Sequence, residues 1–252
     1  MISWSTRRQF LYITVAAVIL FLSVALPTYF VVYKAPSCSD GVQNHGEQGI
    51  DCGGPCALIC KSSALDIIVH WQRAFRVKDG VYNALAYVEN PNIDSGIGKI
   101  SYRFKLYDSE NILIYERDGQ TFIPPNKIFG IFESNILTGS RIPARTLFEF
   151  LGEPIWQKNY AVSPALSMGN KLLSEQDGLP RLTATLENHE GATVDNIEVV
   201  AIVYDSEDNA IASSRTIVDS LERGGTSDIV FTWPEPFVNT AVRTELTYRV
   251  LR

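Results

Sequence analysis

Tyr107-Asp108-Ser109-Glu110 is repeated in the second half of the chain as Tyr204-Asp205-Ser206-Glu207, 97 residues later. Two further dipeptides recur in the same order at nearly the same offset: Glu89-Asn90 as Glu187-Asn188, and Arg145-Thr146 as Arg243-Thr244. Three ordered matches at one offset indicate an internal duplication. A period near 100 residues is that of a whole domain, not of a solenoid repeat.

The sequence around the repeats consists of short apolar or alternating segments separated by polar turns. Valine, isoleucine, tyrosine and phenylalanine dominate them, as in half-buried strands. In the first copy these segments are Leu65–Trp71, Tyr82–Val88, Ile100–Tyr107, Ile112–Tyr115 and Thr146–Phe150. Only Leu172–Gln176 departs from the pattern, and we expect a short helical turn or a loop there. Many short strands with regular turns predict an all-β fold with one β-sandwich per copy.

The recurring polar residues are interpreted as turn formers. An aspartate that follows a strand accepts backbone N–H bonds and starts a turn, and Asp108 and Asp205 both occupy that position. Asn90 and Asn188 end the preceding strands in the same way. We place the boundary between the copies around Gly152-Glu153-Pro154, which gives domains at residues 63–153 and 154–252.

Phe104-Lys105-Leu106-Tyr107-Asp108 resembles the signature of the FxLYD domain, an immunoglobulin-like bacterial module. The second copy reads Ala201-Ile202-Val203-Tyr204-Asp205, with alanine in place of phenylalanine and valine in place of leucine. The resemblance implies two tandem immunoglobulin-like sandwiches, each of seven or eight antiparallel strands. It also implies a binding or spacer role without enzymatic activity.

The N-terminal residues predict a membrane span. Residues 10–33 carry no charge, and Arg7 and Arg8 are the only charges before them. A helix over this run measures roughly 36 Å, enough to cross a hydrocarbon core of about 30 Å. The two arginines favour a cytoplasmic N-terminus of residues 1–9, a lipid bilayer contact through residues 10–33, and everything from Lys34 onward outside.

Three alternatives to a retained span stay open. A cleaved secretory signal has an apolar core of roughly 7–15 residues, shorter than this run. Lipid attachment at Cys38 requires the cysteine close to the apolar run, but Lys34 and Pro36 intervene. Residues 6–11 resemble a twin-arginine export signal, which would mean folding before export.

A cysteine-rich segment at residues 34–62 holds every cysteine of the chain: Cys38, Cys52, Cys56 and Cys60. Outside the cytoplasm such a cluster predicts disulfides, and four cysteines allow three pairings. Zinc is the alternative, although the spacing matches no common zinc pattern closely.

The segment resembles a short cysteine-rich motif of bacterial surface proteins, written C-x-D-G-x-x-N-x-x-E-x-x-x-D-C-G-G-x-C. Within it, Asp40, Asn44, Glu47 and Asp51 offer oxygen atoms in a constrained loop. Calcium prefers several such oxygens, so one hypothesis is that the loop binds calcium as a cofactor. The other hypothesis is that these side chains cap turns through the backbone.

The chemistry of the exported part argues against catalysis and nucleic-acid binding. Without Arg7 and Arg8 the chain has 20 Lys+Arg and 28 Asp+Glu. The resulting net charge of −8 disfavours binding to nucleic acid. The three histidines lie apart, and no nucleophile elbow, phosphate loop or zinc-protease helix occurs. The apolar stretch at 123–132 predicts an exposed patch at Ile128 and Phe129 that contacts the neighbouring domain or another protein; the alternative is a core strand.

These observations predict a membrane-anchored, non-catalytic binding or scaffold protein of a prokaryotic envelope, with other envelope proteins as partners. Two alternatives are a calcium-dependent adhesion or sensing module and an accessory subunit of an envelope enzyme or secretion complex. Partner identity and homo-oligomerisation stay open.

Overall fold

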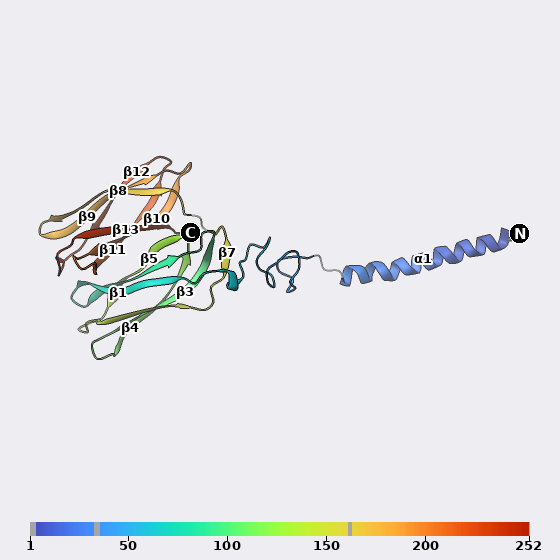
Figure 1. Cartoon of the computed structure of the whole chain (residues 1–252), viewed down its shortest axis with the longest axis horizontal. Coiled ribbons are helices and arrows are strands. Elements are labelled where there is room, and N and C mark those ends of the chain that lie inside the picture. The colour runs from blue at the N-terminus through green and yellow to red at the C-terminus, as the bar shows by residue number, and fades with distance from the viewer. Residues whose placement is uncertain (1–3, 33–35, 161–162, 252) are drawn as a thin grey trace. The chain divides into compact units, whose positions relative to one another are not determined.

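The computed structural model describes residues 4–32, 36–160 and 163–251. It divides into two compact units, Met1–Ala57 and Leu58–Arg252, which are described separately. The first contains the helix α1 and the cysteine-rich segment up to Ala57, and the second contains Cys60 and all the strands β1 to β13 (Figure 1).

Helix α1 spans Trp4–Val32, 29 residues with Pro27 inside. It begins six residues before the predicted span and includes Arg7 and Arg8, while the predicted last residue, Tyr33, lies outside the described residues. The stretch Trp4–Phe30 is long and apolar enough to cross a membrane, and its most apolar 18 residues have a mean hydropathy of 2.4. An N-terminal signal sequence satisfies the same criterion.

The first sandwich contains seven strands in two sheets. One sheet has the order β1-β2-β5 and the other β4-β3-β6, with the short strand β7 added to β3. The bounds are β1 Ile68–Lys78, β2 Val81–Asn90, β3 Ser95–Tyr107, β4 Leu113–Ile123, β5 Lys127–Leu137, β6 Arg145–Leu151 and β7 Trp156–Lys158. A single 3-10 turn, Lys61–Ser63, precedes β1.

The second sandwich repeats this arrangement with six strands. Its sheets have the orders β8-β9-β12 and β11-β10-β13, equivalent strand for strand to β1-β2-β5 and β4-β3-β6. The bounds are β8 Leu166–Gln176, β9 Leu179–Asn188, β10 Val194–Tyr204, β11 Ala210–Leu221, β12 Thr226–Thr232 and β13 Arg243–Val250. The repeated dipeptides fall at equivalent strand ends, which confirms the alignment of the two copies.

Each copy has the strand order of the first six strands of an immunoglobulin sandwich: A-B-E in one sheet and C′-C-F in the other. Among the described residues, no strand takes the G position beside β6 or β13. β7 pairs instead with Ser95–Ile97 at the start of β3.

The repeated polar residues organise the turns as predicted. Asp108 Oδ1 accepts the backbone N–H groups of Glu110 and Ile112, and Asp205 Oδ1 accepts those of Glu207 and Asn209. The preceding asparagines are fully buried. Asn90 Nδ2 donates to Ser95 O and Pro124 O, and Asn188 Nδ2 donates to three carbonyls: Ala192 O, Leu221 O and Glu222 O.

Two predictions of organisation are wrong. Trp156 is buried in the first core and pairs with Ile97, so the first domain continues to Lys158 and does not end near Gly152-Glu153-Pro154. Leu172–Gln176 is neither helical nor a loop but the second half of β8. Its own residues favour a strand only weakly, and pairing with β9 stabilises the strand conformation.

Candidate functional site

The cysteine-rich segment is disulfide-bonded, as predicted. Cys38 pairs with Cys56, with the two Cα atoms 5.5 Å apart. Cys52 and Cys60 are disulfide-bonded as well, and the described chain has no free cysteine. The structure thereby selects one of the three pairings that the sequence left open.

The four predicted calcium ligands are close together, but the carboxylates of three of them, Asp40, Glu47 and Asp51, already accept hydrogen bonds. Asp51 Oδ1 accepts the N–H groups of Asp40 and Gly41, and Asp40 Oδ1 accepts that of Val42. Glu47 Oε2 accepts the N–H groups of Asn44 and Asp51, at 3.3 and 3.2 Å. These contacts support the turn-capping hypothesis, and calcium binding stays a prediction.

Glu47 also lies against the disulfide. A carboxylate oxygen of this buried side chain and the sulfur atoms of Cys38 and Cys56 all lie within 4.8 Å of one another. Both sulfur atoms are held in the disulfide, so neither is a thiolate ligand, and the group braces the loop in this state.

The predicted exposed patch at Ile128 and Phe129 is only half present. Ile128 is 40% exposed, but Phe129 is 1% exposed, because the alternation along β5 turns it into the core of the first sandwich. Phe129 is therefore a core residue and not an exposed one, and its contact with the neighbouring sandwich comes from Arg249 over its ring. The same strand does contact the neighbouring sandwich, through Phe132.

The two sandwiches meet through a third apolar layer. Phe75, Leu85 and Phe132 from sheet β1-β2-β5 pack against Val200, Ile202, Tyr204 and Ala210 from β10 and β11. Gly130 permits this close approach: a Cβ there would lie 2.6 Å from Leu85 Cδ1 and 3.2 Å from Val200 Cγ1. β10 is consequently buried on both faces over Ile197–Tyr204.

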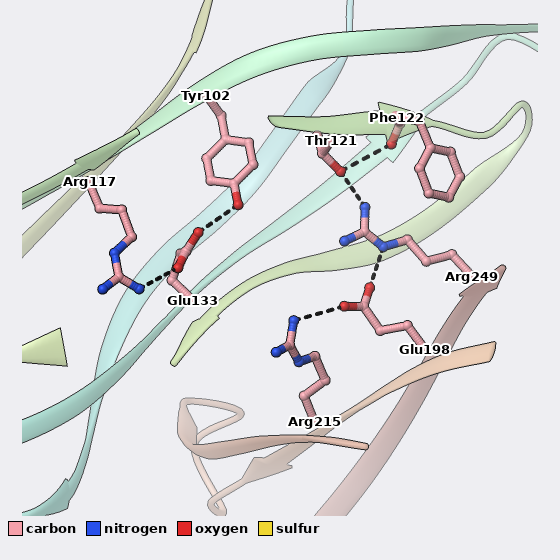
Figure 2. Close-up of polar contacts among 8 residues, drawn as sticks. All are labelled: Tyr102, Arg117, Thr121, Phe122, Glu133, Glu198, Arg215 and Arg249. Atoms are coloured by element: carbon pink, nitrogen blue, oxygen red, sulfur yellow. Dashed lines mark hydrogen bonds and ion pairs between the residues drawn. The ribbon is translucent and has the colours of Figure 1, made fainter. Parts of the chain in front are cut away.

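A buried ion cluster lies beside this layer and is centred on Glu198 of β10 (Figure 2). Glu198 is 2% exposed and pairs with Arg249 of β13 and, at 3.2 Å, with Arg215 of β11. Arg249 reaches into the first sandwich, where its guanidinium donates to Thr121 Oγ1 at 2.5 Å and lies 5.2 Å from the ring centroid of Phe129. One arginine thus links both sandwiches.

A second polar group lies close to this cluster on the first sandwich (Figure 2). Tyr102 donates its hydroxyl to Glu133 Oε1 at 2.7 Å, and Arg117 pairs with Glu133 Oε2 at 2.9 Å. Burial, together with the hydrogen bond to Glu133, raises the pKa of Tyr102 far above its usual range. The tyrosine therefore stays protonated and serves as a hydrogen-bond donor.

Further polar contacts surround the junction. Arg73 Nη1 donates to Ala210 O at 2.5 Å, and Tyr87 donates to Glu245. Lys127 Nζ lies 3.2 Å from the ring centroid of Tyr248, and burial lowers the pKa of Lys127 to about 8. The junction therefore combines apolar packing with paired charges.

Sequence reasoning did not single out the residues of this junction, although three signals were present. Glu198 is the one charged residue in an otherwise apolar run, Ile197–Tyr204. Arg249 lies between Tyr248 and Val250, and Gly130 interrupts an apolar strand. A glycine inside a strand indicates close backbone approach, and a run without alternation indicates burial on both faces.

Ser167, His189 and Glu187 form the arrangement that most resembles a catalytic triad. Ser167 Oγ lies 2.7 Å from His189 Nε2, but Glu187 approaches the same nitrogen at 3.7 Å. A triad requires the acid on the opposite ring nitrogen. His189 is also about half exposed, so this group has the geometry of surface hydrogen bonding.

Comparisons with known proteins give no family. No family model matches the chain, and no curated protein matches it. Among solved structures, the transglutaminase of red sea bream aligns with 72% of this chain and 31% of its own, at 8% identity and a TM-score of 0.23. The chain thus spans about a third of that protein, and a similarity this low supports no conclusion about fold or activity.

Proposed function

We propose that the chain is a single-pass, non-catalytic binding or scaffold protein of a prokaryotic envelope, anchored by α1 with its sandwiches outside the membrane. The observation that carries the proposal is the packed junction between the sandwiches. The resemblance to FxLYD modules and to the cysteine-rich motif of bacterial surface proteins supports the prokaryotic setting.

The composition of the junction favours one rigid unit. Interfaces between mobile domains are usually polar and small, whereas this one contains a continuous apolar layer with five aromatic side chains at or beside it: Trp71, Phe75, Tyr87, Phe132 and Tyr204. Arg249, which forms a buried ion pair with Glu198 inside the second sandwich, adds a hydrogen bond across the junction to Thr121. A rigid pair of sandwiches holds its outer surfaces at a fixed spacing, which suits binding and scaffolding.

Two independent features favour the outside location. Arg7 and Arg8 precede the apolar residues of α1 and favour a cytoplasmic N-terminus. The disulfides of the cysteine-rich segment persist in an oxidising compartment. Both features support an outside location for the residues after α1.

Topology and partners are tested on the full chain in native membranes. We expect it to stay in the membrane fraction after carbonate extraction, and we expect protease added to spheroplasts to degrade the sandwiches. Crosslinking in the membrane followed by mass spectrometry should recover a defined set of envelope proteins. A soluble mature chain, protease-resistant sandwiches inside intact spheroplasts, or recovery of no partner would contradict the proposal.

Calcium-dependent sensing is the second candidate, and one observation favours it. Asn44 Oδ1 is buried without a hydrogen-bond partner, beside Asp40 and Glu47. Calorimetric titration of the full chain with calcium, with Asn44→Ala as the comparison, tests it. Absence of binding at millimolar calcium would remove this candidate.

A further inference from the structure

The second sandwich carries a groove of about 650 Å³ between the edge strand β8 and the loop that joins β12 to β13. Its apolar lining comes from Leu173, Pro180, Pro236, Phe237, Val238 and Ala241. Its polar lining comes from Ser174, Glu175, Asn239 and Thr240, of which only Glu175 is charged.

The β8 wall is a partly protected sheet edge. Within the part of the chain that the structure describes, β8 pairs with β9 on one side only. Its first half has a register shift between Gly169 and Leu172 and an exposed Lys171, features that discourage strand addition. Leu173–Gln176 then continues in regular register. The half of β8 that lines the groove is therefore the half that can accept an added strand.

The loop wall also has backbone groups that form no backbone hydrogen bond with the described residues. Trp233 N donates to Pro180 O and Val242 N donates to Tyr204 O, which fixes the two ends of the loop. Between these ends, residues 234–241 make no backbone–backbone hydrogen bond with any described residue. Asn239 Nδ2 donates to Asp205 Oδ2 at 2.9 Å, and Val238 at the tip is 94% exposed.

We propose that this groove binds an extended, basic peptide segment of a partner protein, added as a strand beside β8. The inference rests on the proposed binding role and assigns it a site. Among the described residues β8 has no strand on its outer edge, and the loop backbone makes no backbone hydrogen bond between its two ends. An extended peptide is a ligand that can form backbone hydrogen bonds with both. Leu173 and Phe237 accommodate apolar side chains on alternate positions, while Glu175 and the net charge of −8 outside the membrane favour lysine or arginine.

Three fluorescent ten-residue peptides test the proposal on the full chain in detergent micelles. One alternates valine with lysine, one alternates valine with glutamate, and one is the lysine peptide with alternate backbone nitrogens methylated. We expect anisotropy to show the lysine peptide binding about tenfold or more tightly than either of the others. Hydrogen exchange should slow at residues 173–176 and 235–241 when it binds.

Glu175→Lys tests the contribution of charge, and Glu222→Lys, at another exposed position of the same sandwich, is the matched control. We expect Glu175→Lys to abolish the preference for lysine and Glu222→Lys to retain it. Equal binding of the methylated peptide, protection elsewhere in the chain, or concentration-dependent self-association that protects β8 would overturn the proposal. Those results would leave the membrane and crosslinking tests unaffected, so the two failures are distinguishable.

Discussion

Removing Arg249 tests whether the junction depends on the charge cluster at Glu198. Arg249→Met keeps a long apolar side chain but removes the guanidinium that pairs with Glu198 and donates to Thr121 Oγ1. Glu198 is 2% exposed, so its carboxylate would stay buried with only Arg215 as a charged partner, at 3.2 Å.

The expected cost follows from the burial of both partners. Removing one member of a buried ion pair costs about 3–5 kcal/mol, because the other charge is left uncompensated. Arg215 offsets part of this, whereas the lost stacking of Arg249 on Phe122 and Phe129 adds about 0.5–1 kcal/mol. We therefore expect Arg249→Met to lower the free energy of unfolding by about 3 kcal/mol.

The assay is urea unfolding of the full chain in detergent, followed by the fluorescence of Trp71, Trp156 and Trp233. The double variant Glu198→Leu with Arg249→Met should unfold within about 1 kcal/mol of the wild type, because it leaves no unpaired buried charge. Arg103→Met, on the exposed face of β3, should cost less than about 1 kcal/mol. A single-variant cost below about 1 kcal/mol, or a double variant no more stable than the single, would refute the reasoning.

Three further predictions concern other parts of the chain. Lys127→Met should be about 1 kcal/mol more stable than the wild type at pH 7, since burial opposes the ammonium more than the ring of Tyr248 favours it. Because the folded pKa of Lys127 is about 8 and the unfolded one is 10.5, wild-type stability should rise relative to Lys127→Met between pH 8 and 9.5; a constant difference would contradict this. Asn188→Ala should cost about 3 kcal/mol by removing the side-chain donor of Ala192 O and Leu221 O and leaving Glu222 O with Gly225 N alone. The exposed Asn209→Ala, at a position without positive φ, should cost less than about 1 kcal/mol in the same urea assay. Intact-mass analysis of the membrane form should show α1 retained, and a mass that begins beyond Ala25 would identify a cleaved signal instead.

Local rules predicted the repeated turns correctly, but they failed for the strand segment Leu172–Gln176. Asp108 and Asp205 follow strands and bond the N–H groups two and four residues on, which depends only on neighbouring sequence. The repeat at a fixed offset predicted that both copies share one topology. The disulfides were predicted from clustering, but the Cys38–Cys56 pairing required the loop geometry.

Tertiary contacts account for what the sequence did not show. Trp156 was assigned to the wrong side of a boundary because its partner, Ile97, lies far away in the sequence. Glu198 and Arg249 meet because β10 and β13 are neighbours, and Thr121 joins them from the other sandwich. The apolar run of β10 indicated burial on both faces but did not identify the strands that cover it.

The sheet faces that lie outside the junction differ from it in their chemistry. The junction buries one face of β1-β2-β5 against one face of β11-β10-β13. The equivalent free face of β4-β3-β6 carries charged pairs, Arg103 with Asp118 and Lys105 with Glu149. The other free face, on β8-β9-β12, carries Thr183, Thr185 and Asp228, with Thr185 Oγ1 donating to Asp228 Oδ1. Burying the charged pairs of β4-β3-β6 would cost desolvation, whereas the face of β8-β9-β12 also exposes Leu172 and Val230 beside Thr183. The groove beside β8 lies outside the two faces that the junction uses.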